Sequence, residues 1–389
     1  MSELKELSIQ FPGCKPNGRI RLGMGIASQL GIELSALTAG RVLFVIDPVI
    51  VSLSAHLPLL TSVEQAGLAY DIFSEVQPEP HLDGMKPLEE MLRATAYGAV
   101  VGLGGGSALD TAKLVAVMAY TGCSAEDIFA DQKRITGSLP TVLLPTTSGT
   151  GSEVSPYSVM SDGTTKKFIN SPYLYATVAM VDPELTVSMP PRVTAATGLD
   201  ALTHGVEGMI GKDTPYTRAL SLQCVELVFR YLPLAVADGS DREARYYLSL
   251  ASVLGMLAYM QGGGLYAHSL SYILTTDHGC PHGVGCGMAL PYTLQLNRDH
   301  IGDILIALGK TLADDRPLTA DEVITRFAAL VKTVGLPCNL PAVGVTEAEL
   351  DGMAETLVGR YFRALNPRRL TVADARVFLQ AMYDETIIF

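Results

Sequence analysis

The stretch Ala99-Val100-Val101-Gly102-Leu103-Gly104-Gly105-Gly106-Ser107-Ala108-Leu109-Asp110-Thr111-Ala112-Lys113 decides the fold. A short apolar run, which is typical of a buried strand, passes through glycines into a helical pattern. The glycines let the backbone approach a pyrophosphate closely, and the helix N-terminus offers N–H donors and a favourable dipole. The alternative is an ordinary tight turn, because Ser107 stands where a GxGxxG motif needs its third glycine. The context favours phosphate binding.

The first half of the chain alternates between short apolar runs and helical patterns. Residues 41–47, 70–73, 99–103 and 141–145 are predicted strands, and helical patterns such as 87–97 and 107–120 fall between them. Strands separated by helices indicate an open, mostly parallel α/β sheet. We therefore expect a Rossmann-like dinucleotide-binding domain.

The pattern changes after the prolines of Met189-Pro190-Pro191-Arg192, which are suited to open a helix. Strand-like runs nearly vanish, and the predicted helices lie at 193–210, 215–232, 241–260 and 320–334. We predict two domains, an α/β dinucleotide-binding domain over residues 1–190 and an all-helical metal-binding and substrate domain over residues 191–389.

Composition narrows the class of protein. The 389 residues are 48% hydrophobic and carry a net charge of -12, so nucleic acid and anionic membranes are disfavoured partners, and a homodimer or higher homo-oligomer is expected. The chain begins without a signal-peptide pattern and has no uninterrupted apolar run of about 18 residues. A reducing cytoplasm fits the sparse cysteines. These are Cys14, Cys123, Cys224, Cys280, Cys286 and Cys338.

Four residues in the second half form a candidate metal site. Asp200 and His204 lie four positions apart, so they can share one face of a helix. His268 and His282 follow, the latter in Cys280-Pro281-His282-Gly283. One carboxylate and three imidazoles suit a divalent transition metal. A satisfied core histidine is the alternative at each position, although a buried Asp200 would require a cation or hydrogen-bond donors.

Neighbours of the four residues leave further alternatives open. Glu207 could orient an imidazole, and His278 could replace a ligand or cap a helix. Cys280 and Cys286 flank His282, so a sulfur ligand is an alternative that we disfavour, since thiolate beside iron is a specialised choice.

Two polar positions follow predicted strands of the sheet. Asp47 ends the first strand, where a carboxylate can accept hydrogen bonds from adenosine ribose hydroxyls, or can form an Asx-turn before Pro48. The run Pro145-Thr146-Thr147-Ser148-Gly149-Thr150-Gly151-Ser152-Glu153 follows the fourth strand. Hydroxyls and glycines at this place commonly face the ligand crevice of an α/β sheet, and they can also cap a helix.

The residues quoted above resemble the iron-containing (group III) alcohol dehydrogenase family. The matching stretches are residues 102–113, 144–156, 182–208, 279–291 and Asn366-Pro367-Arg368-Arg369. The resemblance implies a dehydroquinate-synthase-like fold, with an N-terminal nucleotide-binding domain and a C-terminal helical domain. It also implies NAD(P)-dependent alcohol oxidation or aldehyde reduction.

The resemblance also implies roles for individual residues. Asp200, His204, His268 and His282 match the metal ligands of the family. The positions that match its cofactor contacts are Gly104, Gly105, Gly106, Ser107, Asp110, Thr146, Thr147, Thr150 and Lys167. Asp47 matches a position where a carboxylate accompanies a preference for NAD over NADP. Asp110 is in addition a candidate catalytic residue.

Two departures from the family pattern affect the site. Many members carry a second histidine four residues after the third ligand, near the nicotinamide, and Tyr272 stands there in this chain. Tyr272 could relay a proton, with an ordinary pKa of ~10, or could only shape the pocket, which we favour. Glu79 replaces an asparagine that several members carry near the adenine.

These observations together predict a metal-dependent, NAD-linked alcohol dehydrogenase that acts on a small alcohol or aldehyde. Fe²⁺ is the expected metal and Zn²⁺ the alternative. The metal would act as a Lewis acid on the substrate oxygen while hydride passes to or from the nicotinamide. The alternatives are a polyol dehydrogenase, a maleylacetate-type reductase, a dehydroquinate-synthase-like lyase, or a binding protein that kept the fold.

Overall fold

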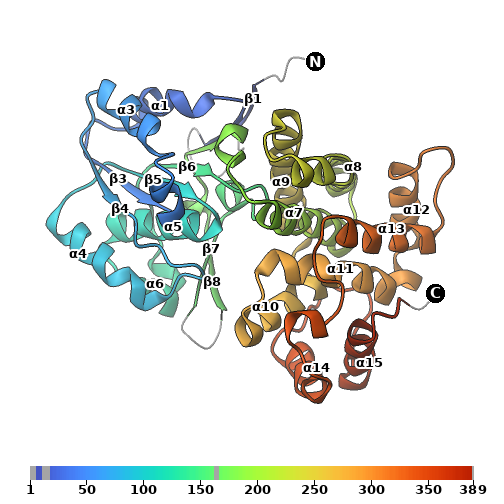
Figure 1. Cartoon of the computed structure of the whole chain (residues 1–389). Coiled ribbons are helices and arrows are strands. Elements are labelled where there is room, and N and C mark those ends of the chain that lie inside the picture. The colour runs from blue at the N-terminus through green and yellow to red at the C-terminus, as the bar shows by residue number, and fades with distance from the viewer. Residues whose placement is uncertain (1–5, 11–17, 162–165, 388–389) are drawn as a thin grey trace. The chain divides into compact units, whose positions relative to one another are not determined.

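A computed structural model describes residues 6–10, 18–161 and 166–387 of the chain. The chain forms two compact units. Residues 1–147 and 151–188 make the first, and residues 148–150 and 189–389 make the second. We call them the α/β unit and the helical unit, and Figure 1 shows the strands of the first in blue to green and the helices of the second in yellow-green to red. Cys14 and the first five residues, on which the signal-peptide expectation rested, lie outside the described residues.

The α/β unit contains a seven-stranded sheet in the order β1-β2-β9-β6-β5-β3-β4, in which only the β1–β2 pair is antiparallel. A separate antiparallel ribbon joins β7 and β8. The strands are β1 (Leu7–Gln10), β2 (Arg19–Leu22), β3 (Val42–Ile46), β4 (Tyr70–Phe73), β5 (Ala99–Gly104), β6 (Thr141–Pro145), β7 (Tyr157–Ser161), β8 (Lys166–Asn170) and β9 (Val178–Val181). The predicted parallel α/β sheet is confirmed.

Helices cover both faces of the central strands, which explains why those strands are apolar throughout. Val101 and Leu103 of β5 belong to a core cluster with residues of α1 and α3. On the opposite face, a Cβ atom at Gly102 would lie 2.8 Å from the Cβ of Ala112 in α5, so the glycine allows this helix to pack closely. The helices of this unit are α1 (Leu30–Leu37), α2 (Pro48–Ser52), α3 (Leu57–Gln65), α4 (Lys86–Ala94), α5 (Gly106–Thr121) and α6 (Ala125–Ala130).

The helical unit has no strand among its described residues, as the sequence predicts. Its helices share one core cluster. They are α7 (Pro191–Gly211), α8 (Pro215–Ala237), α9 (Arg242–Gly262), α10 (Tyr266–His278), α11 (His282–Asn297), α12 (Gly302–Thr311), α13 (Ala320–Thr333), α14 (Leu350–Gly359) and α15 (Val372–Tyr383).

Small residues bring α7 and α9 unusually close together. A Cβ atom at Gly208 of α7 would lie 2.6 Å from the backbone of Ala258 in α9. A Cβ atom at Gly255 of α9 would lie 2.6 Å from the carbonyl oxygen of Ala201 in α7. Only glycine fits at either position without moving a helix, so α7 is held firmly against its neighbour.

Within the part of the chain that the structure describes, one helix, α8, is long and apolar enough to cross a membrane, and α9 with α10 passes the same test as a pair bent by 106°. Core helices of water-soluble proteins have the same length and composition. Val225, Val228 and Leu232 of α8 are buried in the core cluster of the helical unit, which accounts for the apolar composition of this helix.

Candidate functional site

The predicted metal ligands come together within the helical unit. Asp200 and His204 lie on one face of α7, His268 lies in the first turn of α10, and His282 is the first residue of α11. The Nε2 atoms of His204, His268 and His282 lie 4.0, 3.8 and 3.8 Å from Oδ1 of Asp200. Each of the three histidines thus lies close enough to Asp200 to share an ion with it. The donor atoms that all lie within 4.8 Å of one another are those of Asp200, His268, His282 and Cys286, so His204 is not part of the tightest group.

Each imidazole is oriented by a partner at its other nitrogen. Nδ1 of His204 lies 3.2 Å from the carbonyl oxygen of Gly149, and Nδ1 of His282 lies 2.8 Å from Oγ of Ser271. Nδ1 of His268 lies 2.6 Å from a carboxylate oxygen of Glu207. Hydrogen bonds of this kind fix the ring orientation and direct Nε2 of each histidine toward a metal.

Glu207 has a second task, since it also holds the start of α10. Its two carboxylate oxygens accept hydrogen bonds from the backbone N–H groups of Leu265, at 2.7 Å, and Ala267, at 2.8 Å. A carboxylate at a helix N-terminus is favoured by the helix dipole. Burial raises the pKa of Glu207 to about 7, although the N–H groups of Leu265 and Ala267 and the charge of Arg363 act in the opposite direction. This residue therefore couples the position of α10 to the orientation of His268.

Two atoms of the cluster are buried and have no hydrogen-bond partner among the residues that the structure describes, namely Oδ1 of Asp200 and Nε2 of His268. Burial acts to raise the pKa of Asp200, but His204 and His282, together with smaller contributions that include a hydrogen bond with Cys286, outweigh it and lower the pKa, which keeps the carboxylate ionised. Burial lowers the pKa of His268 well below its ordinary value, so this ring is neutral. A buried carboxylate beside a neutral imidazole whose lone pair is unused fits a bound cation.

Of the alternative ligands considered from the sequence, one lies beside the four residues and another does not. The thiol of Cys286, one turn after His282 on α11, lies 3.6 Å from Nε2 of His282. It offers a donor atom within 4.8 Å of those of Asp200, His268 and His282. His278 lies instead 3.6 Å from a carboxylate oxygen of Glu349. Cys286 therefore lies close enough to the other donors to be an alternative ligand, although the sequence analysis disfavoured a sulfur ligand. His278 lies outside this group of donors.

Aromatic rings surround the imidazoles. Tyr259 of α9 meets His204 edge-on, with ring centroids 4.7 Å apart. Tyr272 is stacked on His282, with centroids 5.3 Å apart and an angle of 16° between the rings. Burial raises the pKa of Tyr272 to about 12, despite a lowering by Arg363. The phenol is therefore a neutral hydrogen-bond donor at ordinary pH.

The glycine-rich loop lies at the carboxyl end of β5, beside the end of β3. Gly104 has φ +153°, and a Cβ atom there would lie 2.7 Å from the Cβ of Asp47. Helix α5 then begins at Gly106, and its N-cap, Gly105, makes no side-chain cap. Strands β3 and β5 are neighbours in the sheet. From β3 the chain continues to β4 at one edge, and from β5 it continues to β6 in the opposite direction. This is the topological switch point at which open α/β sheets bind ligands.

The polar residues near this loop have different environments. Asp47 caps α2 by accepting a hydrogen bond from the N–H of Val49 at 2.8 Å, so the Asx-turn alternative is present. Thr146 is buried and donates its N–H to the carbonyl oxygen of Gly104 at 2.9 Å. Thr147 faces Gly105, where a Cβ atom would lie 3.6 Å from its methyl group.

Two further predicted contacts are placed differently. Thr150 belongs to the short segment that groups with the helical unit. Lys167 lies exposed on β8, whereas the preceding Lys166 forms an ion pair of 2.7 Å with Glu79. The position that matches an adenine contact of the family thus has a lysine partner in this chain.

Asp110 is occupied by contacts inside the α/β unit. One oxygen lies 2.5 Å from the hydroxyl of Ser152, which donates to it, and 2.9 Å from the buried ammonium of Lys113. The other accepts the N–H of Val159 at 2.9 Å. Asp110 therefore connects α5 to the segment after β6 and to β7.

Three elements of the metal cluster carried no recognised signal in the sequence. The carbonyl of Gly149, the hydroxyl of Ser271 and the ring of Tyr259 contact His204 or His282, but their spacing from these histidines follows no metal-site motif. Only Glu207, three residues after His204 on the same helix, was suggested by spacing.

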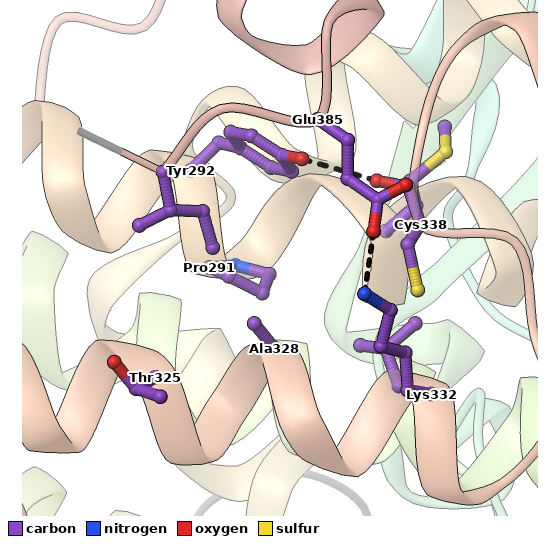
Figure 2. Close-up of a pocket in the computed structure, with 10 residues that line it drawn as sticks. Pro291, Tyr292, Thr325, Ala328, Lys332, Cys338 and Glu385 are labelled. Atoms are coloured by element: carbon purple, nitrogen blue, oxygen red, sulfur yellow. Dashed lines mark hydrogen bonds and ion pairs between the residues drawn. The ribbon is translucent and has the colours of Figure 1, made fainter.

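A separate cavity of about 260 Å³ lies among α11, α13 and the C-terminal segment. Figure 2 shows the ion pair of 2.6 Å between Lys332 and Glu385 at this cavity, and the hydroxyl of Tyr292, which donates to the carbonyl of Cys338 at 3.1 Å. None of the predicted metal or cofactor residues lines it. It is therefore not part of the candidate site.

Known proteins resemble this chain over nearly its whole length. The family model for iron-containing alcohol dehydrogenase matches residues 16–183, and the model for the C-terminal part of the Fe-containing alcohol dehydrogenase family matches residues 194–383. Long-chain-alcohol dehydrogenase 1 of Geobacillus thermodenitrificans is 37% identical over 384 residues, covering 94% of this chain and 95% of that protein. NAD-dependent methanol dehydrogenase of Bacillus methanolicus is 30% identical, covering 91% and 95%.

A solved structure agrees with these sequence matches. The sulfoacetaldehyde reductase of Bifidobacterium kashiwanohense, determined in complex with NAD⁺, has a TM-score of 0.86 and 28% identity, and the match covers 96% of this chain and 99% of that one. The predicted fold, with its Rossmann-like sheet and helical C-terminal region, is confirmed. The chain belongs to the iron-containing alcohol dehydrogenase family, whose members are NAD-linked oxidoreductases that act on alcohols and aldehydes within the dehydroquinate-synthase-like superfamily.

Proposed function

We propose that this chain interconverts an alcohol and an aldehyde with NAD⁺/NADH at a divalent metal held by Asp200, His204, His268 and His282. The observation that carries the proposal is the convergence of three Nε2 atoms on a buried, unpartnered carboxylate oxygen. When bound, the metal supplies Lewis-acid polarisation of a substrate oxygen. Fe²⁺ is the expected ion and Zn²⁺ the alternative, since imidazole and carboxylate suit both.

The residues around the four ligands would preorganise the site. Glu207 keeps His268 in one tautomer, with its proton on Nδ1, and Ser271 and the carbonyl of Gly149 hold the rings of His282 and His204. Because these partners fix the rings beforehand, little rearrangement is required when the substrate oxygen arrives. Tyr259 closes one side of the cluster and limits the access of water to it.

For the cofactor, we propose that Gly104, Gly105, Gly106 and Ser107 bind the pyrophosphate at the N-terminus of α5. The uncapped helix end and the close approach of Gly104 to Asp47 support this role. Thr146, Thr147, Thr150 and Lys167 are proposed as further contacts. The carboxylate of Asp47 would accept hydrogen bonds from the ribose hydroxyls and repel a 2′-phosphate, which favours NAD over NADP.

We propose no acid–base role for Asp110 or Tyr272. The carboxylate of Asp110 is occupied by Ser152, Lys113 and Val159, so it acts as a positioning residue for the loop that follows β6. Tyr272 is stacked on His282 and has a raised pKa, which suits a residue that shapes the site. We further propose a cytoplasmic homo-oligomer, in line with the apolar composition.

The proposal is tested by oxygen-free reconstitution with Fe²⁺ or Zn²⁺, followed by assays of alcohols with NAD⁺ or NADP⁺ and of aldehydes with the reduced cofactors. Steady accumulation of NADH with an alcohol is expected, whereas a lyase that uses NAD only transiently would show none. His268→Ala should lose both metal and turnover. His278→Ala, which alters another histidine of α10, is the matched control and should retain both. Unchanged metal content in His268→Ala would reject the ligand assignment.

A further inference from the structure

Arg363 places a positive charge beside the metal cluster. It lies between α14 and α15 and is partly buried. Its Nε donates a hydrogen bond of 2.7 Å to the hydroxyl of Ser269, the residue that follows His268. Its guanidinium carbon lies 5.8 Å from the centre of the Tyr272 ring. The side chain is thus fixed at one end by a hydroxyl and along its face by an aromatic ring.

The groups that hold Arg363 are all neutral. Among the described residues, no carboxylate forms an ion pair with its guanidinium, and its side chain donates a hydrogen bond to Ser269. A guanidinium has five N–H donors, arranged as a fork that matches the two oxygens of a carboxylate. The donors other than Nε therefore remain available for an anion from outside the chain.

The guanidinium of Arg363 lies one aromatic ring away from a proposed metal ligand. Tyr272 lies between Arg363 and His282, because its ring is stacked on the imidazole of His282 at 5.3 Å. The ring of Tyr361, 5.8 Å from that of Tyr272, adds an apolar wall.

A cation in this place is unfavourable for a protein that binds a divalent metal nearby, since like charges repel. The carboxylate oxygens of Glu207 are already taken by Leu265, Ala267 and His268, so they form no hydrogen bond with the guanidinium. A substrate with an anionic end would give Arg363 an ion-pair partner that a plain alcohol does not offer.

We propose that Arg363 is a specificity-determining residue that binds a carboxylate at the far end of the substrate, so that the enzyme prefers ω-hydroxycarboxylates and the corresponding ω-oxo acids to neutral alcohols. The inference rests on the proposed function. Because the ring of Tyr272 separates Arg363 from His282, the carboxylate lies several bonds from the reacting carbon, which excludes α-hydroxy acids.

The test compares ω-hydroxycarboxylates, from the propanoate to the hexanoate, with primary alcohols of the same chain length, using the metal-loaded enzyme and NAD⁺. The wild type should favour one or more of the acids over the matched alcohol by about 10- to 100-fold in kcat/KM, as expected for a charge-assisted hydrogen-bonded pair. Arg363→Met should abolish this preference, mainly through a higher KM for the acid. The loss in kcat/KM for the acid should exceed the loss for the matched alcohol by at least about 10-fold, and the KM for NAD⁺ should change by less than about 2-fold.

Two further variants separate recognition from a structural role. Arg363→Lys keeps the charge without the planar fork and should recover part of the preference. Arg360→Met removes an exposed arginine three residues earlier and should behave as the wild type. Equal losses on acids and alcohols in Arg363→Met would show that Arg363 only supports Ser269 and Tyr272, which would overturn the proposal.

A binding measurement tests the proposal without depending on catalytic turnover. Calorimetry of the metal-loaded enzyme with NAD⁺ should show butanoate binding to the wild type at least about 10-fold more tightly than to Arg363→Met, and butanamide binding equally weakly to both. If neutral alcohols are oxidised but neither a kinetic preference nor butanoate binding is found, the inference about Arg363 fails and the proposed function stands. If nothing is oxidised while butanoate still binds through Arg363, the proposed function fails and the anion site stands.

Discussion

At the scale of single residues, the proposed metal site depends on the hydrogen bond that orients each imidazole ring. The Nδ1 atoms of His204, His268 and His282 have different partners, a carbonyl, a carboxylate and a hydroxyl, and in each case Nε2 lies about 4 Å from Asp200. Local spacing predicts the pair of Asp200 and His204, since i and i+4 share a helix face. Local spacing cannot predict that His268 and His282 lie beside this pair, because their approach depends on how α10 and α11 pack on α7.

Glu207→Gln tests whether the carboxylate of Glu207 orients His268 and strengthens it as a metal ligand. The amide oxygen can still accept from Leu265 and, less strongly than a carboxylate, from His268, whereas the amide nitrogen cannot accept from Ala267. The weaker acceptor makes His268 a weaker metal ligand. We expect metal affinity to fall by about 10- to 100-fold, measured by competition with a chelator, with secondary structure unchanged. Glu355→Gln, an exposed glutamate on α14, is the control. Equal metal affinity in both variants would contradict this role.

Glu153 gives a prediction for pH. Burial raises its pKa to about 7 from 4.5, so between these values the folded state keeps a proton that the unfolded state releases. The stability it contributes is therefore present in acid and is lost as the pH rises through about 7. With about 1.4 kcal/mol for each pKa unit, the loss is on the order of 3 kcal/mol.

The variant Glu153→Gln cannot ionise and should lose this pH dependence. Relative to the wild type, its free energy of unfolding should rise by the same order between about pH 5 and pH 8, measured by denaturant titration at several pH values. The exposed Glu126→Gln on α6 should follow the wild type. A constant difference between Glu153→Gln and the wild type across this range would show that Glu153 ionises normally in the folded state.

At the scale of elements, what could be predicted from sequence follows from length and burial. The four predicted strands correspond to β3, β4, β5 and β6, whose apolar runs are bounded by turns. Strands β2 and β9 were not predicted, although they are as long as β4. In β2 arginine alternates with a buried apolar residue, and β9 is a short apolar run that periodicity cannot distinguish from a buried helical segment. Helices α10 and α11 were also not predicted, since their apolar residues surround the helix and leave no polar face to mark the period.

Close packing of α7 on α9 is what we expect the proposed metal site to require at the scale of elements. Gly208→Ala would bring a Cβ atom to 2.6 Å from the backbone of Ala258 and so force the helices apart. We expect a loss of about 1–3 kcal/mol in the free energy of unfolding, together with weaker metal binding, because α7 carries Asp200 and His204. Calorimetric unfolding and metal analysis measure the two effects.

The control is Gly352→Ala on α14, where a Cβ atom would have no neighbour within 4 Å. That substitution should raise stability by about 0.5–1 kcal/mol, because alanine favours the helix. If both variants behaved alike, the close approach of α7 and α9 would not matter for folding.

At the scale of the whole molecule, the two units are expected to respond to different ligands. The candidate metal residues all belong to the helical unit, and the glycine-rich loop belongs to the α/β unit. A ligand stabilises the structure to which it binds. Removing the metal should therefore speed amide hydrogen exchange in α7, α10 and α11. Adding NAD⁺ should slow exchange at the start of α5. Metal removal that changed only α5 would contradict this division.

The central claim is that Asp200, His204, His268 and His282 hold one metal ion. Crystals of the protein loaded with Fe²⁺ without oxygen, measured at the iron absorption edge, test it most directly. The account predicts a single anomalous peak at about 2.0–2.2 Å from Oδ1 of Asp200 and from the Nε2 atoms of the three histidines. A peak bound by Cys286 in place of His204, or no peak among these side chains, would contradict it.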